Sequence, residues 1–180
     1  MTALAAPRLR VLAVSGSLRA GSTNTAALQA LATVAPCGVS VTLFEGLRSV
    51  PPFDPDQDGE SLPAPVAALR QALGAADALV ISSPEYARGV SGVLKNALDW
   101  LVGGAEMPGK RVGLVNTSTR AVHAPAALRL TLDTMAARVI EAACVTLPLL
   151  GRTLDAAAIA ADPLLAEPLR DVLTALDDAQ

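Results

Sequence analysis

Residues 8–28 read RLRVLAVSGSLRAGSTNTAAL and contain the change of pattern that decides the fold. An apolar run of strand length, from Arg8 to Ser17, ends in a Gly/Ser turn, and a helical spacing of alanine and leucine follows from Ser22 to Ala35. The apolar run is nearly continuous rather than alternating, which is typical of a strand that is buried on both faces. The stretch therefore predicts a strand, a polar loop and a helix.

The same alternation continues along the chain. Further strands are expected at 39–44, 78–82, 111–118 and 139–147, and further helices at 66–76, 91–102, 125–138 and 156–176, the last interrupted by Pro163 and Pro168. Residues 49–63 are rich in proline and acidic residues and predict a surface loop. We expect one α/β domain over residues 1–180, a doubly wound three-layer sandwich with a five-stranded parallel sheet in the order 2-1-3-4-5. This pattern resembles the flavodoxin-like fold.

Composition and charge exclude several classes of protein. The formal net charge is −3 and no Lys/Arg-rich run occurs, so we expect no nucleic-acid partner. The uncharged window 20–44 is long enough to cross a bilayer, but Pro36 and Gly21 interrupt it and its halves differ in pattern, so we expect no membrane span. The opening MTALAAP has no basic residue and does not predict a signal peptide.

The two cysteines, Cys37 and Cys144, have neither CxxC nor metal-ligand spacing. A reduced, cytoplasmic protein without a metal site is the expected context. In a doubly wound sheet, ligands bind outside the carboxyl ends of the strands, where the strand order reverses. The loops after the first, third and fourth strands are therefore the ones to inspect.

The loop after the first strand, SGSLRAGSTN, is neither a dinucleotide fingerprint nor a Walker A loop. It precedes a helix N-terminus, where free N–H groups and a partial positive charge favour anions. Charge-assisted hydrogen bonds from its arginine would suit a phosphate. The polar residues of this loop are Ser17, Arg19, Ser22, Asn24 and Thr25. Ser22 as a helix cap beside a solvated turn is the alternative, but a cap explains one hydroxyl and not the whole set.

The loop after the third strand, SSPEYARGVSG, contains the only tyrosine of the chain. Pro84 stiffens the turn, and Glu85 and Tyr86 would lie at the carboxyl end of the strand. The tyrosine ring could cover one face of a planar ligand. Packing of the same ring on a neighbouring helix or subunit is the alternative.

Together these two loops resemble the NAD(P)H-dependent FMN reductases of the flavodoxin-like superfamily, which include flavin, quinone, azo-dye and chromate reductases. The first family signature, Gly-Ser-x-Arg-x-x-Ser-x-Asn, is present in residues 16–24. The second, Pro-Glu-Tyr followed by Gly-x-Leu-Lys-Asn-Ala-x-Asp-Trp, is present in residues 84–100. The resemblance extends over nearly the whole chain.

The resemblance implies a bound FMN, with NAD(P)H as co-substrate and a small electron acceptor. It places the FMN phosphate on the polar residues of the first loop and the flavin ring near Ser118 and the third-strand loop. The ring residues so implied are Pro84, Glu85, Tyr86, Ala87, Arg88 and Gly89. Because the flavin carries the chemistry, no catalytic side chain is expected. The resemblance also implies a homodimer or homotetramer, with the Lys-Asn-Ala-x-Asp-Trp helix contributing to the interface.

This chain departs from the family pattern at the mouth of the implied site. Ala87 replaces the family asparagine, and the usual glycine-rich loop after the fourth strand is Thr-Ser-Thr-Arg-Ala in residues 117–121. Arg88 and Arg120 add positive charge there, so one of them is a candidate contact for the 2′-phosphate of NADPH or for an anionic acceptor. A flavodoxin-like electron carrier and a non-catalytic flavin-binding regulator remain alternative functions.

Overall fold

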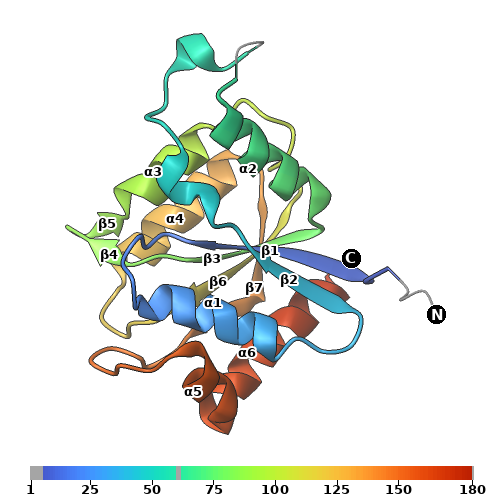
Figure 1. Ribbon diagram of the computed structural model, residues 1–180, viewed down its shortest axis with the longest axis vertical. Helices are drawn as coiled ribbons and strands as arrows, with labels where there is room; N and C mark the ends of the chain where they lie inside the picture. Colours follow the sequence, from blue (N-terminus) through green and yellow to red (C-terminus); the bar gives the residue numbers. More distant parts are fainter. Residues whose placement is uncertain (1–5, 60–61, 180) are drawn as a thin grey trace.

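The computed structural model describes residues 6–59 and 62–179 and contains a central five-stranded parallel sheet (Figure 1). The strands are β1 (Leu9–Ser15), β2 (Val39–Leu43), β3 (Ala78–Ser82), β6 (Arg111–Asn116) and β7 (Arg138–Thr146). Their order, β2-β1-β3-β6-β7, confirms the predicted doubly wound topology. The order reverses between β1 and β3, so the loops after these two strands diverge around one point at the carboxyl edge.

Helices cover both faces of the sheet (Figure 1). On one face lie α1 (Thr23–Thr33), α5 (Ala156–Ala161) and α6 (Pro163–Asp178), and on the other lie α2 (Ala64–Ala75), α3 (Gly92–Asp99) and α4 (His123–Thr134). Alternate residues of β1 enter the two cores, Val11 packing with α1 and α6 and Leu12 with α2 and α3. Both faces of the strand are therefore apolar, which is why its sequence is a continuous apolar run.

Two local predictions need correction. The last helical region breaks at Asp162, before Pro163, as predicted, but Pro168 lies inside α6 without interrupting it. Its missing N–H would have bonded the carbonyl of Leu164 in the exposed first turn of the helix, where water can take its place. The expected loop after β3 also contains a small hairpin, β4 (Glu85–Tyr86) and β5 (Gly89–Val90), which hydrophobic periodicity did not indicate.

The long acidic loop is attached to α3. A short 3₁₀ segment, Gly46–Ser49, leads into it, and a second, Pro55–Gln57, lies within it. The carbonyl of Pro51 accepts hydrogen bonds from Asn96 Nδ2 and Trp100 Nε1, both at 2.8 Å. The rings of Phe53 and Trp100 meet edge to face with centroids 5.1 Å apart. Asn96 and Trp100, the asparagine and tryptophan of the second signature, therefore bind the acidic loop of their own chain.

Whether a helix could span a membrane can be stated only for the described residues. Between residues 6 and 179, apart from 60 and 61, no helix is both long and apolar enough to cross a bilayer. Residues 1–5, which carry most of the segment behind the signal-peptide prediction, lie outside the described residues. So do residues 60 and 61 of the acidic loop.

Candidate functional site

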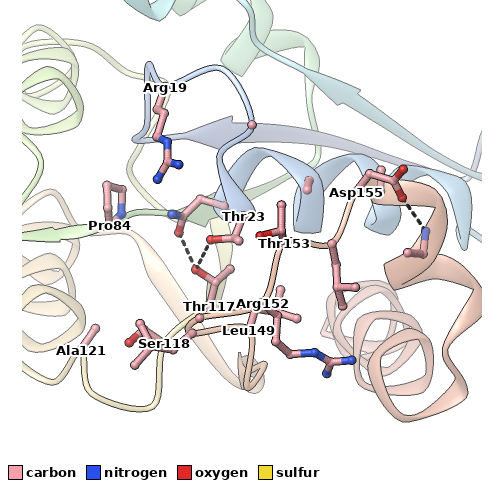
Figure 2. A pocket seen from close by; sticks show the side chains of 18 of the residues that line it. Arg19, Thr23, Pro84, Thr117, Ser118, Ala121, Leu149, Arg152, Thr153 and Asp155 are labelled. Carbon is pink, nitrogen blue, oxygen red and sulfur yellow. Dashed lines mark hydrogen bonds between the residues drawn. The ribbon is translucent and has the colours of Figure 1, made fainter.

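A cavity of about 950 Å³ lies where the loops after β1, β3, β6 and β7 meet at the carboxyl edge of the sheet (Figure 2). Its size falls at the upper end of the usual range for small-molecule sites. The cavity is where the topology predicts a ligand. Each of the four loops contributes lining residues, and each is described in turn.

The loop after β1 ends in the N-terminus of α1 beside the cavity. Ser22 is the N-cap and its Oγ accepts a hydrogen bond from the backbone N–H of Thr25. The next two residues, Thr23 and Asn24, both line the cavity, and their backbone N–H groups have no acceptor within the described part of the chain. Free N–H groups at the positive end of a helix are suited to an anion.

Asn24 connects three of the loops. Its side chain is only 6% exposed, and its Oδ1 accepts hydrogen bonds from Ser82 Oγ at 2.9 Å and Thr117 Oγ1 at 3.2 Å. Thr117 Oγ1 also lies 3.4 Å from Thr23 Oγ1, so two hydrogen bonds meet at Thr117 (Figure 2). With its oxygen fully used, the Nδ2 group of Asn24 has no acceptor among the described residues and remains a donor for a ligand.

The other polar residues of the loop have different roles. Thr25 pairs with Ser15, with 2.8 Å between their hydroxyl oxygens, and Ser17 Oγ accepts from the backbone N–H of Arg19. Arg19 lines the cavity, and its guanidinium donates to no described residue. Of the five residues predicted to hold phosphate, Arg19 and Asn24 line the cavity, and Ser17, Ser22 and Thr25 stabilise the loop that presents them.

The loop after β3 reaches the cavity through Pro84 and Glu85. Glu85 Oε2 accepts hydrogen bonds from the backbone N–H groups of His123 at 2.8 Å and Ala124 at 2.9 Å. These hydrogen bonds, of which the one from Ala124 has the largest effect, hold the pKa of the Glu85 carboxyl below its ordinary value. The side chain predicted to lie against a flavin ring thus caps α4 and fixes the hairpin to it.

Tyr86 and the turn beyond it project from the cavity. Tyr86 is 57% exposed, and neither it nor Ala87, Arg88 or Gly89 is among the lining residues. Ala87 and Arg88 form the two-residue turn with φ of 49° and 60°. Such left-handed turns favour Asn-Gly, and each L-residue with a Cβ costs roughly 1–2 kcal/mol there. Ala87, which replaces the family asparagine, therefore lies in a strained turn.

The end of the hairpin contacts the first loop. Ser91 is buried, and its Oγ donates to the carbonyl oxygen of Gly16 at 2.6 Å. A Cβ on Gly16 would lie 2.9 Å from Ser83 Oγ and from Ser91 Oγ, so a larger residue there would force these serine side chains to move. Ser91 therefore links the end of the hairpin to the backbone of the first loop.

The loop after β6 is held by Asn116. Its Nδ2 donates to the carbonyl oxygens of Ser118 at 2.8 Å and Ala121 at 3.2 Å. Ser118, a predicted ring contact, lines the cavity together with Arg120 and Ala121. An asparagine side chain thus closes a loop that contains no glycine.

The segment between β7 and α5 was not predicted to take part. Residues 149–156 line the far side of the cavity, with Gly151 at φ +76°. The glycine between a strand and a helix in LLGRTLD was the available sequence signal. The role of this glycine depends on the position of β7 beside β6 at the edge of the sheet, which the local pattern does not show.

Three arginines on three different loops line this one cavity, and among the described residues none of their guanidinium groups donates a hydrogen bond: Arg19, Arg120 and Arg152. The two lining carboxylates are engaged with helix N-termini, Glu85 on α4 and Asp155 on the N–H of Ala158. The cavity is therefore cationic and rich in free donors, which fits a phosphate-bearing ligand such as FMN.

The doubly wound sheet, with a donor-rich cavity at its carboxyl edge, defines a flavodoxin-like α/β protein. The chain belongs to the NADPH-dependent FMN reductase family, whose model matches residues 9–149. This confirms the resemblance found in the two signatures.

Several known proteins are similar to this chain. An NAD(P)H-dependent FMN reductase from Pseudomonas aeruginosa is 39% identical over 112 residues, which is 61% of this chain and 60% of the relative. A quinone reductase from Escherichia coli is 40% identical over 118 residues, 64% of this chain and 62% of the relative. The chain thus spans about 60% of the length of these curated relatives.

Among solved structures, FerB, a flavoenzyme NAD(P)H:(acceptor) oxidoreductase from Paracoccus denitrificans, matches with a TM-score of 0.71 and 25% identity. That match covers 94% of this chain and 96% of FerB. An apo NADH:FMN oxidoreductase matches with a TM-score of 0.67 and 20% identity, covering 95% of this chain and 89% of the other, and it supports the fold alone.

Proposed function

We propose that the protein binds FMN in this cavity and passes reducing equivalents from NAD(P)H to a small acceptor such as a free flavin, quinone, azo dye or chromate-like oxidant. The observation that carries the proposal is the cup formed by the N-terminus of α1, Arg19 and the free Nδ2 group of Asn24. Membership of the FMN reductase family and the quinone reductase relative support the same chemistry. Bound FMN would accept hydride from the nicotinamide and deliver electrons to the acceptor.

The residues of the first loop would hold and orient the phosphate. Arg19 and Asn24 would donate to its oxygens, together with the N–H groups at the start of α1. Ser17, Ser22 and Thr25 would act through the loop conformation rather than by contact. Ser82 and Thr117 would keep the Asn24 amide turned with its nitrogen toward the ligand, because they occupy its oxygen.

The ring end would be positioned by the loops after β3 and β6. Pro84 and Ser118 line this part of the cavity, and Glu85 fixes the hairpin that carries Tyr86. Tyr86, Ala87, Arg88 and Gly89 would meet the ring, or a molecule docked over it, only at the outer edge. No side chain is assigned to acid, base or nucleophile chemistry.

The proposed acceptor and co-substrate site includes Arg120, and Arg88 lies on the exposed turn beyond it. Either arginine could attract an anionic acceptor. We expect Arg120→Ala to raise the KM for an anionic quinone more than that for a neutral quinone, with Arg88→Ala as the comparison. Equal KM values in all three proteins would remove both residues from acceptor choice.

The central experiment is anaerobic titration of the FMN-loaded protein with NADPH and, separately, NADH, followed at the flavin absorbance bands. We expect the bands to bleach at one equivalent and to recover when a quinone is added. The same titration of free FMN without protein is the control. A protein that binds FMN but is never bleached would contradict the proposal and favour a flavin-binding regulator.

Steady-state consumption of NADPH separates an enzyme from an electron carrier. An FMN reductase consumes NADPH continuously in the presence of a quinone. A flavodoxin-like carrier would show no such turnover without a protein partner, and that result would replace the enzyme by the carrier.

We also propose a homodimer or homotetramer in the cytoplasm. Exposed apolar side chains on α4 and just before it, Leu130 and Val122, offer contact surface, and α3 carries the exposed Lys95–Asp99 pair. The free cysteines Cys37 and Cys144 are compatible with a reducing compartment. Light scattering after gel filtration tests the assembly, and a monomeric mass would contradict it.

A further inference from the structure

The cavity continues beyond the proposed phosphate cup, between α1 and the β7–α5 segment. We call this part the α1 groove and define it by its lining residues Ala26, Gln29, Arg152, Thr153, Leu154 and Ala158. It extends along α1 from Thr23 to Gln29, about 9 Å at the rise of an α-helix. Figure 2 shows Arg19 and Arg152 at opposite ends of the cavity.

The α1 groove combines an apolar floor with free polar groups. Ala26, Ala158 and Leu154 present small or apolar surface, which suits a flat aromatic base. Gln29 and Thr153 are exposed, and among the described residues their side chains make no hydrogen bond. Apolar surface edged by donors is the chemistry that a nucleoside needs.

Arg152 has its donors available. Its nearest carboxylate is that of Asp162, with 3.8 Å between Nη2 and Oδ2, which is too long for a hydrogen bond. Asp162 itself caps α6 by accepting from the N–H of Leu164. By contrast, Arg10 and Arg70 donate to carboxylates at 2.8 Å. Arg152 is thus a cation beside a cavity without a hydrogen-bonded counter-ion in the described chain.

Arg152 is not required for binding the phosphate of one flavin. A phosphate monoester carries about −1.5 to −2 charges at pH 7, which Arg19 and the N-terminus of α1 can balance. Arg152 lies on a different segment and on the far side of the cup. Of the carboxylates near it, Asp155 is engaged with the N–H of Ala158 and Asp162 lies 3.8 Å away, so a second anionic group of a ligand can compete for the Arg152 guanidinium.

We infer that the α1 groove binds the adenosine 2′-phosphate end of NADPH, and that Arg152 selects NADPH over NADH. This inference rests on the proposed function, because it requires a nicotinamide co-substrate. The two nucleotides differ only in that phosphate, and a guanidinium can bind it through two parallel hydrogen bonds. Arg120, at the ring end, and Arg88, outside the cavity, are placed for the acceptor instead.

The test is isothermal titration of the FMN-loaded protein with 2′,5′-ADP and with 5′-ADP, which lacks the 2′-phosphate. We expect the wild-type protein to bind 2′,5′-ADP at least about tenfold more tightly, and Arg152→Ala to abolish that difference while leaving 5′-ADP unchanged. Arg152→Lys should keep part of the difference in affinity between the two ADPs, because lysine retains the charge but lacks the paired N–H donors of a guanidinium. Arg170→Ala, an exposed arginine on α6, is the matched control.

Separate readouts distinguish failure of this inference from failure of the proposed function. The FMN dissociation constant and the anaerobic bleaching by excess NADPH are measured on the wild-type protein and on Arg170→Ala, and they test the proposed function without any change at Arg152. The inference is overturned if the wild-type protein binds neither ADP, or if Arg152→Ala weakens both ADPs or FMN equally. It is also overturned if Arg120→Ala or Arg88→Ala removes the 2′-phosphate preference and Arg152→Ala does not.

Discussion

The loop after β1 and the hairpin after β3 border the same cavity but are built in opposite ways. In the first, Ser22 and Asn24 are buried; the Ser22 side chain caps its own helix, and that of Asn24 accepts from the neighbouring strand β3. In the second, Tyr86 and Arg88 are exposed, and the turn holds two non-glycine residues at positive φ. Glu85 fixes this hairpin to α4 by accepting hydrogen bonds from the backbone N–H groups of His123 and Ala124.

This difference matches the demands on the two ends of a flavin site. A phosphate has a fixed shape and a negative charge, so a rigid cup with free donors can be prepared for it before binding. A site that admits first a nicotinamide and then an acceptor has to stay open. The hairpin is therefore the part of the site where residues can change without disturbing the cup, except at Ser91, which bonds to Gly16.

The largest expected effect comes from removing the centre of the rigid loop. Asn24→Ala deletes the acceptor for Ser82 and Thr117 and the free amide donor. We expect the FMN dissociation constant to rise by about ten- to a hundredfold and the free energy of unfolding to fall by about 1–3 kcal/mol. Flavin fluorescence titration and urea unfolding measure the two quantities. Thr33→Ala, at the exposed end of the same helix, is the control and should change neither quantity. Unchanged FMN affinity in Asn24→Ala would contradict the proposal that this cup binds the FMN phosphate.

A smaller effect of opposite sign is expected at the strained turn. Arg88→Gly should raise the free energy of unfolding by about 1 kcal/mol, because glycine adopts φ near 60° without a Cβ clash. Arg88→Ala removes the same charge but keeps the Cβ, so it should give no such gain. Urea unfolding compares the three proteins. Equal stabilisation by both variants would attribute the effect to charge rather than to backbone strain.

The pH dependence of the Glu85 contact is the smallest predicted effect. Folding lowers the pKa of this carboxyl, so the stabilisation is present above its ordinary value of 4.5 and is lost as the pH falls through the folded value. Glu85→Gln should therefore melt at a lower temperature than the wild-type protein at pH 7. This difference in melting temperature should disappear below pH 4.5. Thermal melts from pH 7 to 3 measure it.

Glu167→Gln, an exposed residue on α6, is the control for removing a carboxylate. It should melt like the wild-type protein throughout that range. If the difference in melting temperature between Glu85→Gln and the wild-type protein stays constant with pH, the charge on Glu85 does not hold the hairpin to α4.

Most of the fold was predictable because hydrophobic periodicity is a local property. The strand order, the layers and the position of the site all followed from apolar runs and from the rule for doubly wound sheets. The small hairpin and the continuous helix through Pro168 were not predictable in this way. Two-residue strands carry too little pattern, and the cost of an internal proline depends on whether solvent reaches the carbonyl it leaves free.

For the site, the sequence by itself determined the composition of the loop after β1, the Pro-Glu-Tyr turn and hence the family. Only the tertiary structure decided what each polar residue does. Asn24 meets Ser82 and Thr117, Glu85 meets His123, and Arg152 joins the cavity from the fifth strand. These partners are separated along the chain by tens of residues, and their meeting depends on how the strands are ordered in the sheet, so no local pattern of residues could reveal them.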